Sequence, residues 1–404
     1  MLNARLSGMT DYPFTRLAGL LGKVPPYTGR LPLNLAVGEP QSPPPAMVAD
    51  TLARHADEWG RYPPIAGTPE FRAAVAGWLG RRYKLPTGSI DVDRAILPVQ
   101  GTREALFQIA TVAAAHNGRD DAVVLFPNTS YATYAAAGYL AGAEAVALST
   151  RRENSFLPYL DQLDPDLLDR AALMYLCSPS NPEGAVADID YLQTAIALAR
   201  RHNFVLAVDE CYAEIWDEAP PPGTLEAAVG LKVEGDDPFA NIIVFHSLSK
   251  RSSAAGLRSG FVAGDRRIIA LMQRLRTYSS SAPPLPILAA SAALWSDEAH
   301  AAEIRDSYRA KIDLAETALE GAVGFYRPAG GFFLWLEVGD GEQAAVRLWR
   351  DAAIRVLPGA YLGRPDADGV NPGDRFIRLA LVHDNATLGP ALGRVAELLS
   401  TGGH

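Results

Sequence analysis

The sequence predicts an α/β protein with a mostly parallel sheet sandwiched between helices, followed by a smaller α+β region. Between residues 47 and 290, short apolar runs alternate with stretches of helical periodicity. Runs of about four to six apolar residues are typical of parallel strands that are buried on both faces. New strand patterns follow near the C-terminus, after a long helical stretch. These observations together favour two α/β units of unequal size.

The first 45 residues differ from the rest of the chain. Residues 12–21 are amphipathic, and prolines are dense from Pro25 to Pro45. Proline fixes φ and lacks an amide proton, so this density favours an extended arm over a packed domain. We therefore expect a large domain over residues 46–290. A small domain would combine residues 291–404 with the arm, residues 1–45.

Periodicity also predicts the individual elements in order. Helices are expected over residues 71–83, 103–115 and 191–202, and strands over residues 122–126, 143–148, 173–176, 204–208 and 242–245. One long helix is expected over residues 287–321. The small domain should contain strands over residues 331–336 and 376–381 and a terminal helix over residues 388–399.

Composition and charge argue against several classes of protein. The 404 residues are 48% hydrophobic and 21% charged, as in a globular domain, and no apolar run approaches the roughly 18 residues of a membrane span. A net charge of −9 argues against a nucleic-acid or anionic membrane partner. The only cysteines, Cys177 and Cys211, form no disulfide framework or zinc pattern. We expect a cytoplasmic protein without a metal site, with both thiols in the core.

The segment that begins at Ser247 carries the most informative chemistry. Lys250 follows the apolar run 242–245, with hydroxyls at Ser247 and Ser249 and a guanidinium further on at Arg258. A buried lysine is unfavourable unless it is paired or chemically used, and hydroxyls beside an arginine suit a phosphate. A lysine beside a phosphate site indicates pyridoxal 5′-phosphate bound to that lysine. The alternative is a strand that ends in a solvated basic turn.

Other polar residues follow the predicted strands, where ligands bind in open parallel sheets. Asp209 can pair with a pyridinium nitrogen, although a lone aspartate there could also cap a helix. Tyr212 can direct its hydroxyl toward the ring oxygen. Asn181 lies between two prolines, so it could form a plain turn or donate to the same ring oxygen.

Further candidates are more ambiguous on their own. Gly101 and Thr102 precede a predicted helix, whose N-terminal amides could bind phosphate or could simply be capped. Tyr131 could stack on a pyridine ring or pack in the core. Arg378 lies in a strand-like run where an unpaired guanidinium would be costly, so we expect a carboxylate partner.

Together these segments resemble the class I/II, fold-type I aminotransferases, which depend on pyridoxal phosphate, over essentially the whole chain. The matching motifs are Arg61-Tyr62 through Gly67, Gly101-Thr102, Ser180-Asn181-Pro182-Glu183-Gly184, Asp209-Glu210-Cys211-Tyr212, Ser247-Leu248-Ser249-Lys250 and Arg378. Gln100 departs from the pattern, since many relatives have a small residue there.

The resemblance implies a role for each matched residue around the cofactor ring. Lys250 would bind the cofactor covalently and then shuttle a proton. Asp209 would pair with the ring nitrogen, and Asn181 and Tyr212 would hydrogen-bond the ring oxygen. Tyr131 would stack on the ring.

The resemblance also implies a phosphate site, a substrate site and a homodimer that acts on an amino acid and a 2-oxo acid. The phosphate would be held by Gly101, Thr102, Ser247 and Arg258, with Tyr62 reaching across from a second subunit. Arg378 would bind the substrate α-carboxylate, helped by Asn181 and by the backbone at Gly38.

Within the family, the chain is most similar to the bacterial N-succinyldiaminopimelate aminotransferases of lysine biosynthesis. This similarity lies in residues 12–17, 37–40, 250–264 and 295–300. It implies N-succinyl-LL-2,6-diaminopimelate and 2-oxoglutarate as substrates.

Several other functions stay open at this point. The alternatives on the same fold are a broad aspartate or aromatic aminotransferase and a C–S β-lyase that uses the same lysine. The ligand-sensing domain of a transcription regulator is disfavoured, because such proteins carry an added basic segment. Arg16, Lys23 and Arg30 are candidates for the distal end of the substrate only by their charge.

Overall fold

The computed structural model describes residues 4–7, 9–114, 121–231, 235, 237–321, 324–366 and 369–400. A seven-stranded sheet with the order β2-β8-β7-β6-β5-β3-β4 forms its centre. The strands are β2 (Ile96–Val99), β3 (Val123–Asn128), β4 (Glu144–Ser149), β5 (Ala171–Cys177), β6 (Val205–Asp209), β7 (Ile242–Ser247) and β8 (Gly260–Gly264). Within this described sheet β8 alone runs against the other strands. The mostly parallel sheet predicted from the sequence is confirmed.

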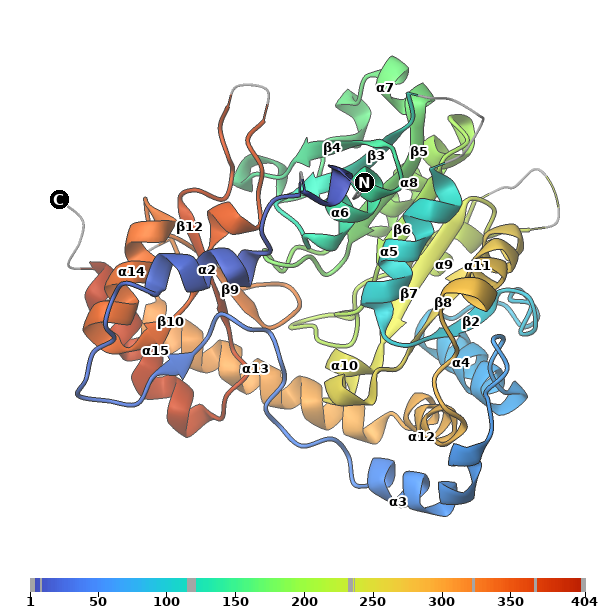
Figure 1. Cartoon of the computed structure of the whole chain (residues 1–404), viewed down its shortest axis with the longest axis horizontal. Helices are drawn as coiled ribbons and strands as arrows, with labels where there is room; N and C mark the ends of the chain where they lie inside the picture. The colour runs from blue at the N-terminus through green and yellow to red at the C-terminus, as the bar shows by residue number, and fades with distance from the viewer. Residues whose placement is uncertain are drawn as a thin grey trace.

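Helices cover both faces of this sheet (Figure 1). One face carries α4 (Pro69–Arg82), α8 (Ile189–Arg201), α9 (Thr224–Val229) and α12 (Leu285–Ser296), and the other carries α5 (Thr102–Ala113), α6 (Thr133–Leu140) and α11 (Arg266–Ser279). Along β3, Val123 and Leu125 pack on the first side, whereas Val124 and Phe126 pack on the second. Alternate residues of a strand point to opposite faces, so a strand covered on both sides is apolar at nearly every position.

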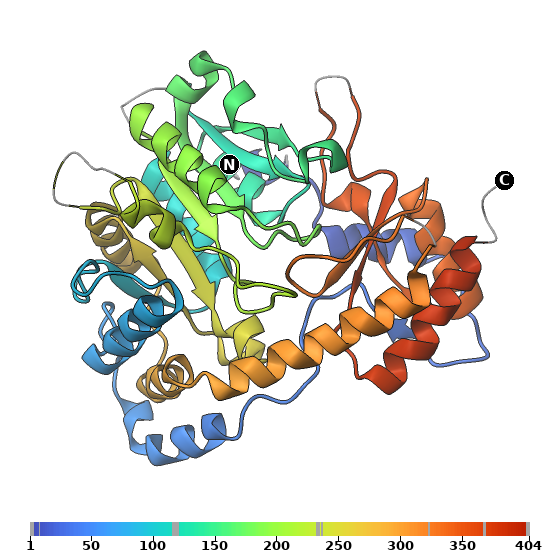
Figure 2. The same ribbon diagram turned by 180° about the vertical axis from the view of Figure 1, so that it is seen from behind.

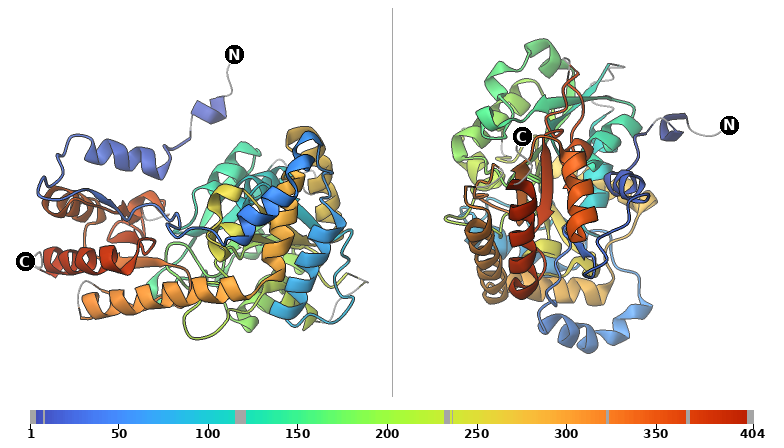
Figure 3. Two further views of the ribbon diagram at one scale, coloured as in Figure 1. Left: turned by 90° about the horizontal axis from the view of Figure 1, so that it is seen from below. Right: turned by 90° about the vertical axis from the view of Figure 1, so that its left-hand side faces the viewer.

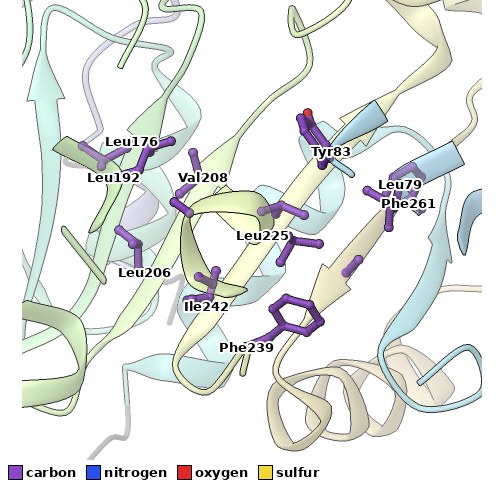
Figure 4. Packing of buried hydrophobic residues seen from close by; sticks show 14 of the residues in the cluster. Leu79, Tyr83, Leu176, Leu192, Leu206, Val208, Leu225, Phe239, Ile242 and Phe261 are labelled. Carbon is purple, nitrogen blue, oxygen red and sulfur yellow. The ribbon is translucent and has the colours of Figure 1, made fainter. Parts of the chain in front are cut away.

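The core on the first face draws on elements from across the large unit (Figure 4). Leu79 comes from α4, Leu225 from α9 and Phe261 from β8, and all are fully buried. Burial of one such side chain contributes about 1.5–3 kcal/mol relative to exposure. This packing fixes the sheet on which the site residues are mounted.

The sequence supplies caps where helices on this face begin. At the start of α4, Thr68 Oγ1 accepts a hydrogen bond of 3.2 Å from the Phe71 amide, and Pro69 occupies the first turn. At the start of α8, Asp188 Oδ1 accepts one of 2.8 Å from the Tyr191 amide. Each such cap contributes about 1 kcal/mol. The helices therefore begin two residues before the first predicted helical residue.

A second, three-stranded antiparallel sheet lies in the C-terminal part, in the order β11-β12-β9. The C-terminal part contains β9 (Phe333–Glu337), α14 (Gly341–Ala352), β10 (Ile354–Arg355), β11 (Leu357–Pro358), β12 (Phe376–Ala380) and α15 (Asn385–Ser400). Leu336 and Ile377 form part of its core together with apolar residues of α14 and α15. The predicted smaller α+β unit is thus present. The two domain boundaries stay predictions.

The long helical pattern corresponds to two helices, so the prediction of one helix over residues 287–321 was wrong. α12 ends at Ser296, and α13 (Ala299–Leu319) begins after a break. Asp297 there is extended, and its Oδ1 accepts a hydrogen bond of 3.0 Å from the His300 amide. A local aspartate cap interrupts a periodicity that looks continuous. From this break α13 runs across to the C-terminal part (Figure 2).

The N-terminal arm lies along the C-terminal part. α2 (Pro13–Leu21) buries Leu17 and Leu21 against residues of β11 and α14, and β1 (Leu33–Asn34) pairs in parallel with β10. α1 (Ala4–Ser7) lies at the periphery of the molecule (Figure 3), where Arg5 donates a hydrogen bond of 2.6 Å to the Tyr139 carbonyl. The remaining α-helices are α3 (Met47–Arg54), α7 (Pro165–Arg170) and α10 (Leu248–Arg251). None of the helices described here has the length and apolar character needed to cross a membrane.

Candidate active site

The carboxyl ends of the central strands meet at one edge of the sheet. β5 ends at Cys177, which pairs in register with Asp209 at the end of β6, and β7 ends at Ser247. Because β8 is antiparallel, its first residue, Gly260, lies beside Ser247 and brings the preceding Arg258 to the same edge. A cavity of about 510 Å³ opens there between the sheet edge and residues of the N-terminal arm and the C-terminal part.

Most of the residues predicted for the site line this cavity. They are Gly38, Thr102, Tyr131, Asn181, Asp209, Tyr212, Ser247, Lys250, Arg258 and Arg378. Gly101 lies directly against Arg258, since a Cβ there would collide with the guanidinium. Tyr62 is the exception, because it is 100% exposed and lies outside the cavity lining.

Lys250 lies in α10, the short turn of helix that directly follows β7. Its Nζ donates a hydrogen bond to the Gly38 carbonyl and lies 5.2 Å from the centre of the Phe332 ring. Burial lowers the pKa of this amine to about 8. Near pH 7, the neutral fraction of Lys250 is therefore larger than that of a lysine exposed to water. A neutral amine of this kind can attack a carbonyl and can accept a proton.

Asp209 is a buried carboxylate without a cationic hydrogen-bond partner among the described residues. Its Oδ2 accepts a hydrogen bond of 2.8 Å from the Tyr134 hydroxyl, and its Oδ1 accepts one of 3.1 Å from the Cys211 amide. Burial raises the pKa of this carboxyl despite these bonds. A protonated pyridine nitrogen in the cavity would supply the missing positive charge.

Hydroxyl and guanidinium groups also line this cavity. Ser247 Oγ and Ser249 Oγ lie 2.9 Å apart. Arg258 Nη2 has only contacts of 3.3 Å, to the Gln100 carbonyl and to Glu104. α5 begins here without a side-chain cap, and the amides at the N-terminus of a helix favour an anion. This donor set fits a phosphate.

Gln100, the one departure from the family pattern, does not disturb this set of phosphate donors. Its backbone carbonyl faces Arg258, while its side chain turns away and donates a hydrogen bond of 3.0 Å to Ser281 Oγ. Gly101 follows with φ of 82°, a conformation that a side chain would strain. The glycine therefore places α5 close to the guanidinium.

Arg378 is buried in β12, with its guanidinium at the cavity. Nη1 donates a hydrogen bond of 2.8 Å to Asn181 Oδ1, Nη2 donates one of 2.9 Å to the Ala36 carbonyl, and Nε has no partner. The expected carboxylate partner is thus not supplied by the described residues, and a neutral amide and a carbonyl take its place. Burial lowers the pKa to about 10, so the group stays charged near pH 7. An unneutralised buried cation of this kind suits a substrate carboxylate.

Sequence reasoning gave no role to three residues of the site. The Tyr134 hydroxyl bonds Asp209, Cys211 Sγ lies 3.1 Å from Thr102 Oγ1, and Glu183 is buried beneath Asn181. Tyr134 lies in the first turn of α6, three residues after Tyr131, and no helix was predicted there. Cys211, expected in the core, instead lines the cavity.

Glu183 forms a buried hydrogen-bonded group with two hydroxyls. Its carboxyl accepts hydrogen bonds from Thr129 Oγ1 and, at 2.9 Å, from Ser180 Oγ. Burial raises the pKa of Glu183 to about 7. Nothing but its place in a motif marked this residue in the sequence.

The doubly covered sheet, with a reactive lysine and an anion cradle on one edge, defines the class of enzymes that transfer amino groups with pyridoxal phosphate. The family model for aminotransferase class I and II matches residues 32–395 of this chain. The chain therefore belongs to this family. Members of the family depend on pyridoxal phosphate and act on amino acids and oxo acids.

Individual relatives cover nearly the whole chain. The 4-dedimethylamino-4-oxo-anhydrotetracycline transaminase OxyQ of Streptomyces rimosus is 34% identical over 90% of this chain and 92% of its own length. An LL-diaminopimelate aminotransferase of Syntrophobacter fumaroxidans is 30% identical over 91% of each chain. The crystal structure of an aminotransferase from Neisseria meningitidis superposes with a TM-score of 0.92 at 37% identity, covering 98% of this chain and 100% of that one.

Proposed function

We propose that this aminotransferase acts on N-succinyl-LL-2,6-diaminopimelate and 2-oxoglutarate in the biosynthesis of diaminopimelate and lysine. The observation that carries the proposal is the relationship, over 91% of the chain, to an enzyme named LL-diaminopimelate aminotransferase. The segments that resemble the N-succinyl enzymes also face the cavity, through Tyr12, Pro13 and Phe14 of the arm and through Ala255 and Gly256 after the lysine. These positions suit residues that select the substrate.

We infer a task for four polar side chains of the cavity. When bound, pyridoxal phosphate supplies an electron-withdrawing ring that stabilises negative charge at the substrate α-carbon. Arg378, braced by Asn181, would orient the substrate α-carboxylate. Lys250 Nζ would accept the α-proton and later release it, and its lowered pKa leaves it partly neutral for this purpose. Asp209 would hold a proton on the ring nitrogen.

We further infer a homodimer in the cytoplasm. Tyr62 belongs to a motif of the site but is fully exposed and outside the cavity lining, as expected for a side chain that completes the active site of a second subunit. A fully exposed tyrosine within a site motif is otherwise unexplained. The free thiols of Cys177 and Cys211 suit a reducing compartment.

A comparison of amino donors tests the proposed substrate. With 2-oxoglutarate as the acceptor, kcat/KM for N-succinyl-LL-2,6-diaminopimelate should be well above that for aspartate, tyrosine or alanine. If aspartate or tyrosine is better by tenfold, which is about 1.4 kcal/mol in transition-state binding, the substrate proposal is wrong. Release of pyruvate from cystathionine would instead favour a C–S β-lyase.

A further inference from the structure

A second cavity adjoins the site described above. It has a volume of about 740 Å³ and lies between the N-terminal arm, α5, α6 and the loop after β11. Five residues line both cavities and form their shared boundary: Tyr12, Pro13, Arg103, Ala132 and Leu362. The second cavity therefore lies next to the site in which Arg378 would hold the substrate.

Three guanidinium groups line the second cavity without an ion pair in the described part of the chain: those of Arg16, Arg103 and Arg364. Two carboxylates also line it, Asp11 and Glu104, and Glu104 already pairs with Arg258 at 3.3 Å. The cavity therefore carries more positive than negative charge, although the whole protein carries a net charge of −9.

Arg364 is held in place by its backbone. Its amide donates a hydrogen bond of 2.9 Å to Asn128 Oδ1, and its carbonyl accepts one of 2.9 Å from Asn128 Nδ2. Asn128 is buried at the end of β3, so the loop is tied to the central sheet. The Arg364 side chain is exposed, its guanidinium lies 5.8 Å from the centre of the Phe126 ring, and partial burial lowers its pKa.

Arg103 and Arg16 are positioned by aromatic rings. Arg103 Nε donates a hydrogen bond of 2.5 Å to the Tyr131 hydroxyl, and its terminal nitrogens have no hydrogen-bond partner among the described residues. The Arg16 guanidinium lies 3.9 Å from the centre of the Tyr361 ring. Such ring contacts fix a guanidinium while leaving its N–H groups available to an anion.

We propose that this second cavity is the subsite for the terminal carboxylate of the succinyl group, with Arg364 as its main anchor and Arg103 and Arg16 beside it. The proposal rests on the proposed function and names the residues that would read the succinyl end. The apolar side chains of Phe107, Phe126 and Tyr139 would face the aliphatic part of the acyl chain. A carboxylate bound to the planar fork of an arginine gains two charge-assisted hydrogen bonds.

The test uses two substrates that differ only at the distal end: N-succinyl-LL-2,6-diaminopimelate and its succinamoyl analogue, in which the terminal carboxylate is an amide. Arg364→Ala should lower kcat/KM for the succinyl substrate about 10- to 100-fold, mainly through KM, as expected for lost hydrogen bonds to a charged group. The value for the succinamoyl analogue should change by less than about threefold. For the succinyl substrate, kcat/KM of Arg364→Lys should lie between the values of the wild type and Arg364→Ala, because lysine keeps the charge but not the planar fork.

Arg94→Ala is the matched control, because it removes an exposed guanidinium that lies outside both cavities. It should leave both substrates unaffected. Borohydride trapping of the cofactor in Arg364→Ala should match the wild type, and so should the sedimentation coefficient. An equal loss for both substrates, no loss for either, or a changed oligomeric state would overturn the subsite.

Failure of the proposed function gives a different result. A wild-type enzyme that does not prefer the succinylated diaminopimelate contradicts the function. The subsite is then tested with Nε-succinyl-lysine against its succinamoyl analogue, which place the acid and the amide at the same distance from the reacting carbon. Arg364→Ala should lower kcat/KM about tenfold or more for the acid alone. If the wild type prefers the succinyl donor and Arg364→Ala leaves the acid-to-amide ratio unchanged, the subsite is wrong and the function survives.

Discussion

Arg378 Nη1 donates a hydrogen bond of 2.8 Å to Asn181 Oδ1. This bond joins β12 of the C-terminal sheet to the loop after β5 of the central sheet. Because the amide oxygen is engaged, the Asn181 nitrogen is the atom left to donate toward a cofactor oxygen. One interaction thus couples the proposed carboxylate anchor to the proposed cofactor contact.

The lowered pKa of Lys250 should set how readily the cofactor binds covalently. We expect the rate at which cofactor-free enzyme recombines with pyridoxal phosphate to rise with pH around 8, rather than around 10.5, because only the neutral amine is a nucleophile. Rapid-mixing absorbance measurements check this expectation. Borohydride reduction followed by peptide mass spectrometry should place the cofactor on Lys250.

Lys311 provides the control for this labelling experiment. It is also buried, and burial also lowers its pKa, but it lies in α13 and does not line the cavity. It should remain unlabelled, and Lys250→Ala should abolish both labelling and turnover while the circular dichroism spectrum is unchanged. Labelling of a different lysine would show that the assignment is wrong.

Asp209→Asn should retain the cofactor but lose turnover. A buried carboxylate stabilises a protonated ring nitrogen far more than it would in water, so kcat should fall about 10²- to 10⁴-fold. Tyr134→Phe removes only the 2.8 Å hydrogen bond to the same carboxylate, so kcat should fall about tenfold. Steady-state kinetics, with cofactor content measured by absorbance, checks both values. A near wild-type kcat in Asp209→Asn would show that Asp209 has only a structural role.

The buried Glu183 should make the stability of the protein depend on pH. Its pKa is raised to about 7 in the folded protein, so the folded state retains a proton that the unfolded chain loses above its ordinary value of 4.5. The free energy of unfolding should therefore decrease as pH rises from about 4.5 through about 7, by on the order of 1–3 kcal/mol. Glu183→Gln, which mimics the protonated acid, should remove this dependence.

Urea denaturation at pH 5 and pH 8 measures the effect of Glu183. The matched control is Glu144→Gln, which changes an exposed carboxylate on β4. The wild type and this control should show the same difference between the two pH values. If Glu183→Gln shows that difference too, Glu183 is not its source.

Hybrid dimers test the proposed role of Tyr62. Lys250→Ala and Tyr62→Ala should each be impaired as pure proteins. Mixed subunits should regain activity, because half of the dimers become hybrids and each hybrid has one intact site. Recovery should approach about a quarter of the wild-type specific activity. A fully active monomer in sedimentation and activity measurements would contradict the shared site.

The central strands could be predicted because burial on both faces makes them apolar throughout. β2 and β8 were missed, since Pro98 interrupts the first and glycines bound the second, at Gly260 and Gly264. The break between α12 and α13 at Asp297 could not be predicted, because it depends on a single capping hydrogen bond.

The cofactor-facing residues of the site could be predicted because they follow strands whose ends share one sheet edge. Arg364 could not be predicted in this way. It follows no apolar strand and matches no motif, and its position depends on hydrogen bonds to Asn128, 236 residues earlier in the chain. Long-range contacts of this kind leave no local pattern.

The hydrogen bond from Arg378 to the Ala36 carbonyl spans 342 positions of the sequence. During synthesis, the ribosome therefore releases the central strands and Lys250 long before the arginine that would hold the substrate. A nascent chain could fold around the cofactor while it is still unable to bind an amino acid. Closing contacts of such length also slows folding. The appearance of activity in a translation reaction should thus report completed chains alone.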